Sequence, residues 1–484
     1  MKQYAYQPRI SPRNNSSRWI ALIALMAAQF MIVIDIAGLN VALPSIKQAL
    51  HFSETNLQWV VSAYQIMFGG CLLLGGRIAD LWGRKRMFLI STALFSVTSL
   101  LCGLAWSDTS LIVFRAIQGI SAALLAPTSL STVTRMFSEG RERNIALGIW
   151  GAVFGAGGAL GSVLSGIITT TFGWTWFFFF NVPLGVFALI VGPLLLPKDN
   201  TERKSQKLDV AGALTVSSGM MAFLYALTQA PQVGWTAPST ILYLLTALFL
   251  FFGFTLIQRK AKSPLLPLFL VGQPTMKAGI IIGVLAGSYH FSLFFLLTLY
   301  MQNVLHFSAL QTAFGYLAAA VFTILCANLI SRLIPRFGVK RLLITGQLLV
   351  TAMFIYLTRI PAEGNYFIDL LPALIIGGIG WGLIFPSINI LSFSGLEKIY
   401  SGTAAGIINM SEQLGGAVGI TMAAIVASVW TGKYMQANPD QGIYAPEAMT
   451  AGFHAVFWVL AGLAALSVIC TAVFNPTYEK TNRS

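Results

Sequence analysis

Three charged side chains lie inside apolar stretches that are long enough to cross a lipid bilayer. They are Asp35, Arg115 and Glu412. A charge in the bilayer core costs at least ~2.5 kcal/mol, so such a residue faces a partner or a water-filled cavity. A carboxylate in that setting can take up a proton or attract a cation. The three residues are therefore candidates for ion pairing, proton transfer or cation binding.

Asp35 and Arg115 are predicted to lie at a similar depth in the membrane. Asp35 is about eight residues from the end of its apolar stretch, and Arg115 is about five from the start of its own; at 1.5 Å per residue both fall in the same half of the bilayer. A salt bridge or a proton-linked pair is geometrically possible. The alternative is a purely structural ion pair, since a permanently charged arginine could simply hold two helices together.

Glu412 is about ten residues into its apolar stretch, near the middle of the membrane. A lone carboxylate at that depth is suited to reversible protonation, because the low dielectric disfavours its charge. The alternative is a neutral acid that is hydrogen-bonded to Gln413 or Asn409.

The composition requires these residues to be carried by membrane helices. Of 484 residues, 56% are apolar and 10% are charged, and the mean hydropathy is +0.75. A soluble domain has about 25% charged residues, which excludes a soluble enzyme. Since a helical span needs about 20 apolar residues, the runs predict fourteen spans, near 19–43, 57–76, 87–106, 110–131, 144–168, 177–196, 209–229, 240–258, 278–301, 310–331, 341–358, 367–393, 402–429 and 452–474.

The positive charges predict the orientation. With both termini in the cytoplasm, all but four of the 30 Lys and Arg fall in cytoplasmic segments. The exceptions are Lys47, Arg359 and Lys433 outside and Arg115 within a span. Cytoplasmic loops collect Lys and Arg, so the net charge of +14 is explained without a nucleic-acid partner.

A weak internal repeat divides the chain. GRIADLWGRKRM (76–87) matches SRLIPRFGVKRL (331–342), with Gly83 opposite Gly338, and only the first copy carries Asp80. Repeated helical bundles are typical of secondary transporters. The predicted segments are a cytoplasmic N-terminus (1–18), an N-terminal six-helix bundle (19–196), a cytoplasmic linker (197–208), two inserted spans (209–258), a cytoplasmic loop (259–277), a C-terminal six-helix bundle (278–474) and a cytoplasmic tail (475–484).

Other motifs are absent or are interpreted as structural. The sequence contains no nucleotide-binding loop, no zinc-binding or His/Cys metal pattern and no potassium-filter pattern, so we expect neither a cofactor nor a metal. The four cysteines form no C-x-x-C pair. His290 is interpreted as a packed, hydrogen-bonded core histidine. The glycine-rich stretch 148–166 predicts closely packed helices.

Four stretches resemble motifs of the major facilitator superfamily, specifically its fourteen-span drug:H⁺ antiporters, which include quaternary-ammonium and methylenomycin exporters. They are IDIAGLNVALP (34–44), GGRIADLWGRKR (75–86), LIVFRAIQGISAA (111–123) and INMSEQLGGAVG (408–419). The resemblance covers about residues 19–474. It implies an all-α polytopic fold of two six-helix bundles, with LDVAGALTVSSG and APQVGWTAP forming the two inserted spans.

The resemblance also implies roles for particular residues, and this sequence differs from the family motifs at several positions. It implies that a conformational loop helps hold one transport state and that Arg115 takes part in proton coupling; the loop residues are Gly76, Asp80, Gly83 and Arg84. In the antiporter motif of span 5, Ser162 and Ser165 replace a proline and a glycine. In span 1, Ala37 replaces a threonine. Many members have arginine at the position of Glu412, and a carboxylate at this position resembles exporters of organic cations.

The predicted function is proton-coupled efflux of lipophilic, cationic drugs or toxic small molecules across the cytoplasmic membrane by alternating access. The predicted proton-coupling residues are Asp35, Arg115 and Glu412, and the predicted substrate-binding residues are Asp35, Glu412, Asn40, Gln118, Tyr289, Trp381 and Phe385. We expect a monomer in the inner (plasma) membrane. One alternative is a dedicated exporter or flippase for one lipid, siderophore or self-made antibiotic. Another is a membrane receptor or scaffold, which predicts no solute flux.

Overall fold

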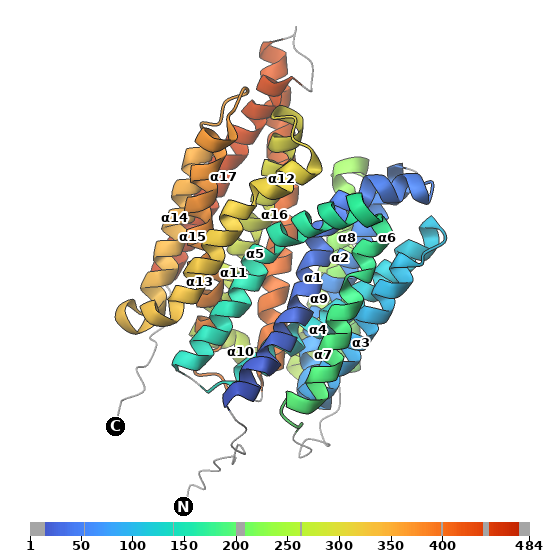
Figure 1. Ribbon diagram of the computed structural model, residues 1–484, viewed down its shortest axis with the longest axis vertical. Helices are drawn as coiled ribbons and strands as arrows, with labels where there is room; N and C mark the ends of the chain where they lie inside the picture. The colour runs from blue at the N-terminus through green and yellow to red at the C-terminus, as the bar shows by residue number, and fades with distance from the viewer. Residues whose placement is uncertain are drawn as a thin grey trace, which may run out of the picture.

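The computed structural model describes residues 15–52, 54–138, 140–199, 209–261, 264–397, 400–438 and 445–473, and these form a helical bundle (Figure 1). Its helices are α1 (Asn15–Ala49), α2 (Glu54–Trp82), α3 (Arg84–Gly103), α4 (Asp108–Met136), α5 (Arg141–Phe172), α6 (Trp174–Phe179), α7 (Asn181–Leu195), α8 (Val210–Val233), α9 (Pro238–Lys260), α10 (Leu268–Gly272), α11 (Pro274–Leu299), α12 (Ala309–Gly315), α13 (Leu317–Phe337), α14 (Val339–Leu357), α15 (Leu371–Ser392), α16 (Ser401–Ala437) and α17 (Pro446–Val473), with π-helical turns η2 (Tyr300–Val304) and η3 (Tyr366–Leu370).

The prediction of fourteen membrane spans is confirmed within the described residues. Thirteen helices are long and apolar enough to cross a membrane, and α5 makes the fourteenth if its two parts, Arg141–Gly158 and Leu160–Phe172, are one span bent by 46°. The Ser162 hydroxyl donates a hydrogen bond of 3.0 Å to the Gly158 carbonyl at this bend. Glycine and serine together are a common cause of sharp bends in helices.

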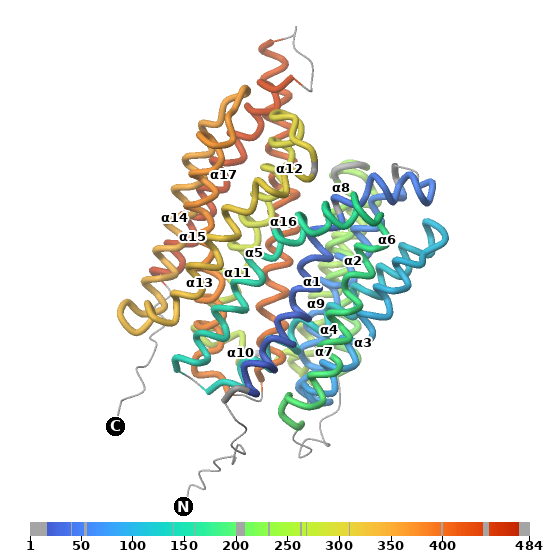
Figure 2. Tube along the Cα trace, in the orientation of Figure 1, coloured from blue at the N-terminus to red at the C-terminus, as the bar shows by residue number. Residues whose placement is uncertain are grey.

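The helices pack in two groups. Helices α1 to α7 contact one another, and α11 and α13 to α17 contact one another. Helix α5 crosses between the groups, packing against α1 on one side and against α13 and α15 on the other (Figures 1 and 2). Helices α8 and α9 pack together, and α8 also packs against α2 and α16. We refer below to α1–α7 as the N-terminal bundle and to α11–α17 as the C-terminal bundle.

The two loops that match in sequence make the same turn. Gly83 joins α2 to α3 with φ of 101°, and Gly338 joins α13 to α14 with φ of 78°. A residue with a β-carbon is disfavoured at such φ angles, so glycine is needed at both places. The repeat in the sequence therefore corresponds to a repeated helix–turn–helix geometry.

Glycine also allows the helices that carry the charged residues to approach closely. A β-carbon on Gly119 of α4 would overlap the backbone of Tyr64 in α2. A β-carbon on Gly287 of α11 would overlap the backbone of Glu412 in α16. Small residues at such crossings are the usual means of close helix packing in a membrane. The α2–α4 and α11–α16 crossings set the positions of Arg115 and Glu412, respectively.

Helix α1 begins and α17 ends at the same end of the molecule, the lower end in Figure 1. We call this end the terminal side; the sequence predicts that it faces the cytoplasm. Backbones of the two bundles meet there. Gly148 and Gly151 of α5 lie against Ala327 of α13 and Pro386 of α15, and the Arg143 guanidinium donates a hydrogen bond of 3.2 Å to the Phe393 carbonyl. The bundles are therefore closed against each other at the terminal side.

Candidate functional site

Asp35 and Arg115 form an ion pair inside the N-terminal bundle. Arg115 Nη1 donates to Asp35 Oδ2, and the side chains are 0% and 1% exposed. Arg115 Nε also donates to the Val60 carbonyl of α2, at 3.0 Å. The aromatic ring of Tyr64 lies 4.3 Å from the guanidinium carbon, within the range of a cation–π contact. The pair thus joins α1, α2 and α4.

Gln118 extends the pair into a network. Its Oε1 accepts a hydrogen bond of 2.7 Å from Arg115, and its Nε2 donates to Asp35 Oδ1 at 3.3 Å and to Ser99 Oγ of α3 at 2.6 Å. Both carboxylate oxygens of Asp35 are therefore engaged. A proton arriving at Asp35 would remove one charge from a network that connects four helices, so protonation and helix packing are linked here.

Asp35 and Gln118 are enclosed by helices of their own bundle, and both are 0% exposed. In this conformation they lie away from the surface where the bundles meet. The side chain of Asn40, a third predicted substrate-binding residue, lies outside the described part of the chain. Asp35 and Gln118, both predicted to bind substrate, therefore belong to the ion-pair network inside the N-terminal bundle.

Glu412 is in a different environment. Its side chain is 5% exposed, and among the described residues no hydrogen bond or ion pair is made to it, including from Gln413 or Asn409. A β-carbon on Gly283 of α11 would lie 3.8 Å from the Cγ of Glu412. Glu412 is thus a buried carboxylate without a counter-charge among the described residues.

The faces of α16 show which way Glu412 is turned. Gly402 and Gly406 lie against α2, and Gly415 lies against α11, whereas Val418 is 40% exposed on the lipid side. At 100° per residue, Glu412 lies on the face that packs against α11, between the directions of Gly416 and Gly419, which lie against Phe291 and Ser288 of α11. Glu412 therefore faces α11, within the C-terminal bundle.

The predicted aromatic residues lie together in the C-terminal bundle. Trp381 and Phe385 of α15 stack with ring centroids 5.4 Å apart, and Tyr289 of α11 lies 5.3 Å from Trp381. Tyr289 is 0% exposed and also contacts Phe354, so its ring belongs to the interior of this bundle. Phe385 also contacts Phe154 of α5, at 4.9 Å, and therefore reaches the other bundle.

Sequence reasoning missed the centre of this aromatic group, which is His290 of α11. Its ring lies 4.4 Å from Trp381 and 5.0 Å from Phe385, between centroids. The hydrogen bond expected for a core histidine is not found: Nδ1 is buried without a partner among the described residues. The signal available in the sequence was the spacing of His290, Phe291 and Phe294, which puts aromatic rings beside a mid-span imidazole.

The predicted conformational loop is assembled at the terminal side. Asp80 at the end of α2 accepts a hydrogen bond from Arg84 and also contacts the start of α16. There its carboxylate accepts from the backbone N–H of Gly402 at 3.0 Å and from the N–H and hydroxyl of Thr403 at 2.8 and 2.9 Å. Gly76 packs against Gly402. A carboxylate at a helix N-terminus is favourable because the helix dipole is positive there.

The two serines that depart from the span-5 motif both bond α5 to α1. Ser165 Oγ donates to the Gly38 carbonyl at 2.6 Å, and Ser162 Oγ donates to the Ala37 carbonyl at 3.4 Å. A β-carbon on Gly38 would overlap Ser165, so the helices are in close contact at this point. The substitutions thus replace a proline–glycine pattern with hydroxyl groups that hold α5 to α1.

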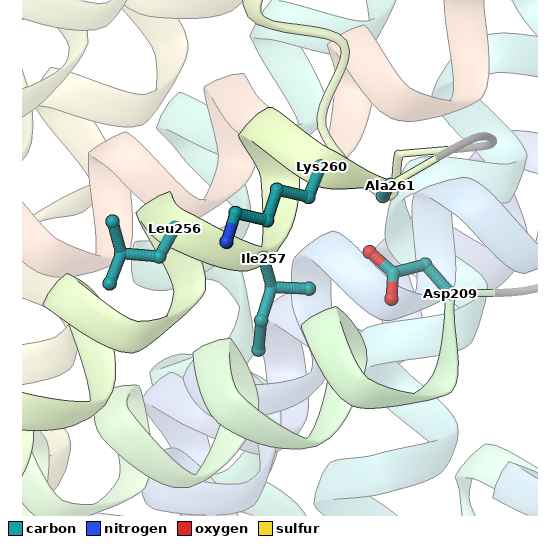
Figure 3. A pocket seen from close by; sticks show the side chains of 5 residues that line it. All are labelled: Asp209, Leu256, Ile257, Lys260 and Ala261. Atoms are coloured by element: carbon teal, nitrogen blue, oxygen red, sulfur yellow. The ribbon is translucent and has the colours of Figure 1, made fainter.

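A groove on the surface is formed where α8 and α9 meet at the terminal side, and it is lined by Asp209, Leu256, Ile257, Lys260 and Ala261 (Figure 3). Asp209 accepts hydrogen bonds there from Gln258 and from the N–H of Gly212, and so caps α8. Neither residue of the ion pair lines the groove, and neither do Glu412 and His290. Within the described ranges, no group of three His, Cys, Asp or Glu residues could hold a metal ion.

Comparison with known proteins gives consistent results. The family model described as Major Facilitator Superfamily matches residues 25–420. The puromycin resistance protein pur8 of Streptomyces alboniger is 34% identical over 421 residues, covering 86% of this chain and 83% of the relative. The cephamycin export protein CmcT of Amycolatopsis lactamdurans is 33% identical over 419 residues, covering 86% of each chain. The tetracenomycin C resistance and export protein of Streptomyces glaucescens is 31% identical, covering 87% and 79%.

Two solved structures have the same fold. The human organic anion transporter MFSD10 superposes with a TM-score of 0.67 at 15% identity, covering 95% of this chain and 100% of that one. The proton:xylose symporter XylE superposes with a TM-score of 0.60 at 14% identity, covering 94% and 95%.

Proposed function

This chain belongs to the Major Facilitator Superfamily of membrane transporters, and from that premise we propose that it exports lipophilic, cationic drug-like molecules in exchange for protons, by alternating access. It is a multi-pass protein of the cell membrane rather than an enzyme. The observation that carries the proposal is Glu412, a carboxylate that is buried against α11 near the middle of α16 and has no partner among the described residues.

The relatives support the direction of transport. Their names describe resistance to puromycin, export of cephamycin, and resistance to and export of tetracenomycin C. Resistance and export both require movement of the compound out of the cell. We extend this direction to the present chain and assign the cationic preference to Glu412, whose negative charge would attract a substrate of opposite sign.

Each carboxylate has its own part in the proposed cycle. Glu412 binds either the cationic substrate or a proton, so that a proton entering from outside displaces the substrate. Asp35 takes up a proton within its pair with Arg115, and this weakens the network that joins four helices of the N-terminal bundle. If each carboxylate brings in one proton for every monovalent cation that leaves, one net charge moves inward, and ~100 mV then releases ~2.3 kcal/mol, enough for a substrate gradient of roughly tens-fold.

The test is ethidium efflux from energised bacteria that lack their own efflux pumps and express this chain. We expect efflux that a protonophore abolishes, because the proton gradient supplies the energy. If the protein is present in the membrane and ethidium efflux is the same as in cells without it, the proposed multidrug function is wrong.

A second function is favoured by the names of the same relatives, three of which refer to one antibiotic each. This second function is the dedicated export of a single compound. A panel of structurally unrelated drugs distinguishes the two functions. A multidrug exporter raises resistance to several cationic members of the panel, whereas a dedicated exporter raises resistance to none or to one class.

Replacing Asp80 by Asn is expected to open the terminal side more often. The change removes the charge that binds Arg84 and the first N–H groups of α16, and charge-assisted hydrogen bonds of this kind contribute about 1.5–3 kcal/mol each. The measurement is the labelling of Ala327→Cys, placed in a cysteine-free background, by a membrane-impermeant maleimide. Ala327 is 1% exposed against Gly148, so labelling reports separation of the bundles.

We expect labelling of Ala327→Cys to become at least roughly fivefold faster when Asp80→Asn is added. Asp108→Asn is the matched control, because Asp108 is a carboxylate that accepts a hydrogen bond from Asn56 at the start of α2, the opposite end of that helix from Asp80. Equal labelling rates with and without Asp80→Asn would show that this contact does not hold the closed state.

A further inference from the structure

His290 is surrounded by aromatic rings from three helices. Besides Trp381 and Phe385 of α15, they include Phe294 of α11 at 4.9 Å and Phe154 of α5 at 6.3 Å, measured between ring centroids. We call these five residues the His290 cluster. The rings of Trp381, Phe294 and Phe385 meet the imidazole at 71–81°, with edges toward faces. Such contacts fix the orientation of the imidazole.

The cluster leaves a polar atom unsatisfied. His290 is 5% exposed, and within the described part of the chain neither of its ring nitrogens makes a hydrogen bond; Nδ1 is fully enclosed. Burying a polar nitrogen without a partner is unfavourable, and buried polar groups are nearly always paired. A phenylalanine would fill the same space without this penalty. An imidazole here is explained if its partner is a molecule that is present only during part of the transport cycle.

The cluster is also divided between the two bundles. Phe154 is on α5 of the N-terminal bundle, and the other four residues are on α11 and α15 of the C-terminal bundle. Separation of the bundles at this level removes Phe154, which contacts His290 and Phe385, and uncovers those two rings. The cluster is therefore closed in this conformation and becomes accessible when α5 moves.

Glu412 adjoins the cluster. Its backbone packs against Gly287, one helical turn before His290 on α11, and Gly416 of α16 packs against Phe291. Glu412 and the cluster therefore lie on or beside neighbouring segments of α11, about one helical turn apart. A molecule that carries a positive charge on an aromatic framework could contact the carboxylate and the cluster together.

We propose that the His290 cluster binds the aromatic part of the exported molecule, and that the imidazole accepts a hydrogen bond from an amino or hydroxyl group on that ring. The proposal rests on the proposed function and narrows its substrate class to aromatic cations that carry such a donor. Phe385, held in place by Trp381, supplies a stacking surface that binds any flat ring, and His290 supplies the selectivity for the donor.

The test compares two ligands that differ only in the donor. Ethidium carries two ring amino groups, and 5-ethyl-6-phenylphenanthridinium has the same ring system and charge without them. Binding of each to the purified full-length protein is measured by fluorescence titration, with wild type and His290→Phe. We expect His290→Phe to weaken ethidium binding roughly three- to tenfold and to change binding of the amine-free analogue less than about twofold.

Further variants separate a lost hydrogen bond from damaged packing. His290→Asn keeps an acceptor near the position of Nδ1 and should recover part of the preference for ethidium. Phe385→Leu removes a stacking surface and should weaken both ligands equally. His454→Phe is the matched control, because His454 bonds to the Ile360 carbonyl at 2.7 Å and makes no contact with the cluster.

The proposal is overturned if His290→Phe weakens both ligands to the same extent or neither, or if the wild-type protein binds neither. This outcome is separable from failure of the proposed function. Selective binding that depends on His290, without proton-dependent efflux in cells, would retain the site and reject the coupled exporter. Proton-dependent efflux with identical ligand preferences in wild type and His290→Phe would do the reverse.

Discussion

Replacing Asp35 by Asn is expected to abolish proton-driven efflux and also to destabilise the protein. Asp35 is fully buried and holds the only negative charge that the described contacts place on Arg115. Removing one partner of a buried ion pair leaves the other charge uncompensated, which costs about 3–5 kcal/mol. The measurements are ethidium efflux from energised cells and the thermal unfolding temperature of the purified protein in detergent.

The double variant Asp35→Asn with Arg115→Gln distinguishes coupling from a structural role. It removes both charges and keeps polar groups that can bond to Gln118, so the unfolding temperature should recover most of its loss. If the pair couples protons, efflux stays at least tenfold below wild type. If efflux recovers together with stability, the pair is a structural link between α1 and α4, and another group carries the proton.

Replacing Glu412 by Gln is expected to reduce uphill transport of ethidium at least tenfold. The amide keeps the size of the side chain but neither attracts a cation nor binds a proton near neutral pH. The measurement is ethidium accumulation in proteoliposomes with an acidic lumen. Downhill movement of ethidium without a pH gradient should persist, because alternation of the bundles does not need this charge.

Two variants make the Glu412 result specific. Glu412→Asp keeps the carboxylate and should retain part of the uphill transport. Glu397→Gln removes an exposed carboxylate shortly before α16 and should behave as wild type. Wild-type accumulation by Glu412→Gln would remove Glu412 from the coupling scheme and leave Asp35 as the proton carrier.

The number and approximate limits of the membrane spans could be predicted because the bilayer imposes a simple rule. Each span needs about 20 apolar residues and each break needs polar ones, and both can be read along the chain. The same rule picked out Asp35, Arg115 and Glu412, since a charge in an apolar run needs a special reason. The bend of α5 was not predicted, because its motif carries Ser162 in place of the proline that would mark a kink.

The partners of these residues could not be predicted. Gln118 and Ser99 complete the bonding of the ion pair. The carboxylate of Asp80 accepts hydrogen bonds from Gly402 and Thr403, which lie more than 300 positions away in the chain. In both cases the contacts join different helices, and nothing in the local sequence of one helix specifies which face of another helix it meets.

By itself, the sequence determined that this protein is a multi-span membrane protein with charged residues inside three spans, because hydropathy and single buried charges are properties of separate segments. Only the tertiary structure decided that Asp35 is paired and Glu412 is not, and that His290 lies at the centre of an aromatic cluster shared by two bundles. Those differences depend on helix rotation and on glycine contacts between helices distant in sequence, such as Gly287 against Glu412. Two carboxylates inside the membrane spans, Asp35 and Glu412, thereby have different surroundings.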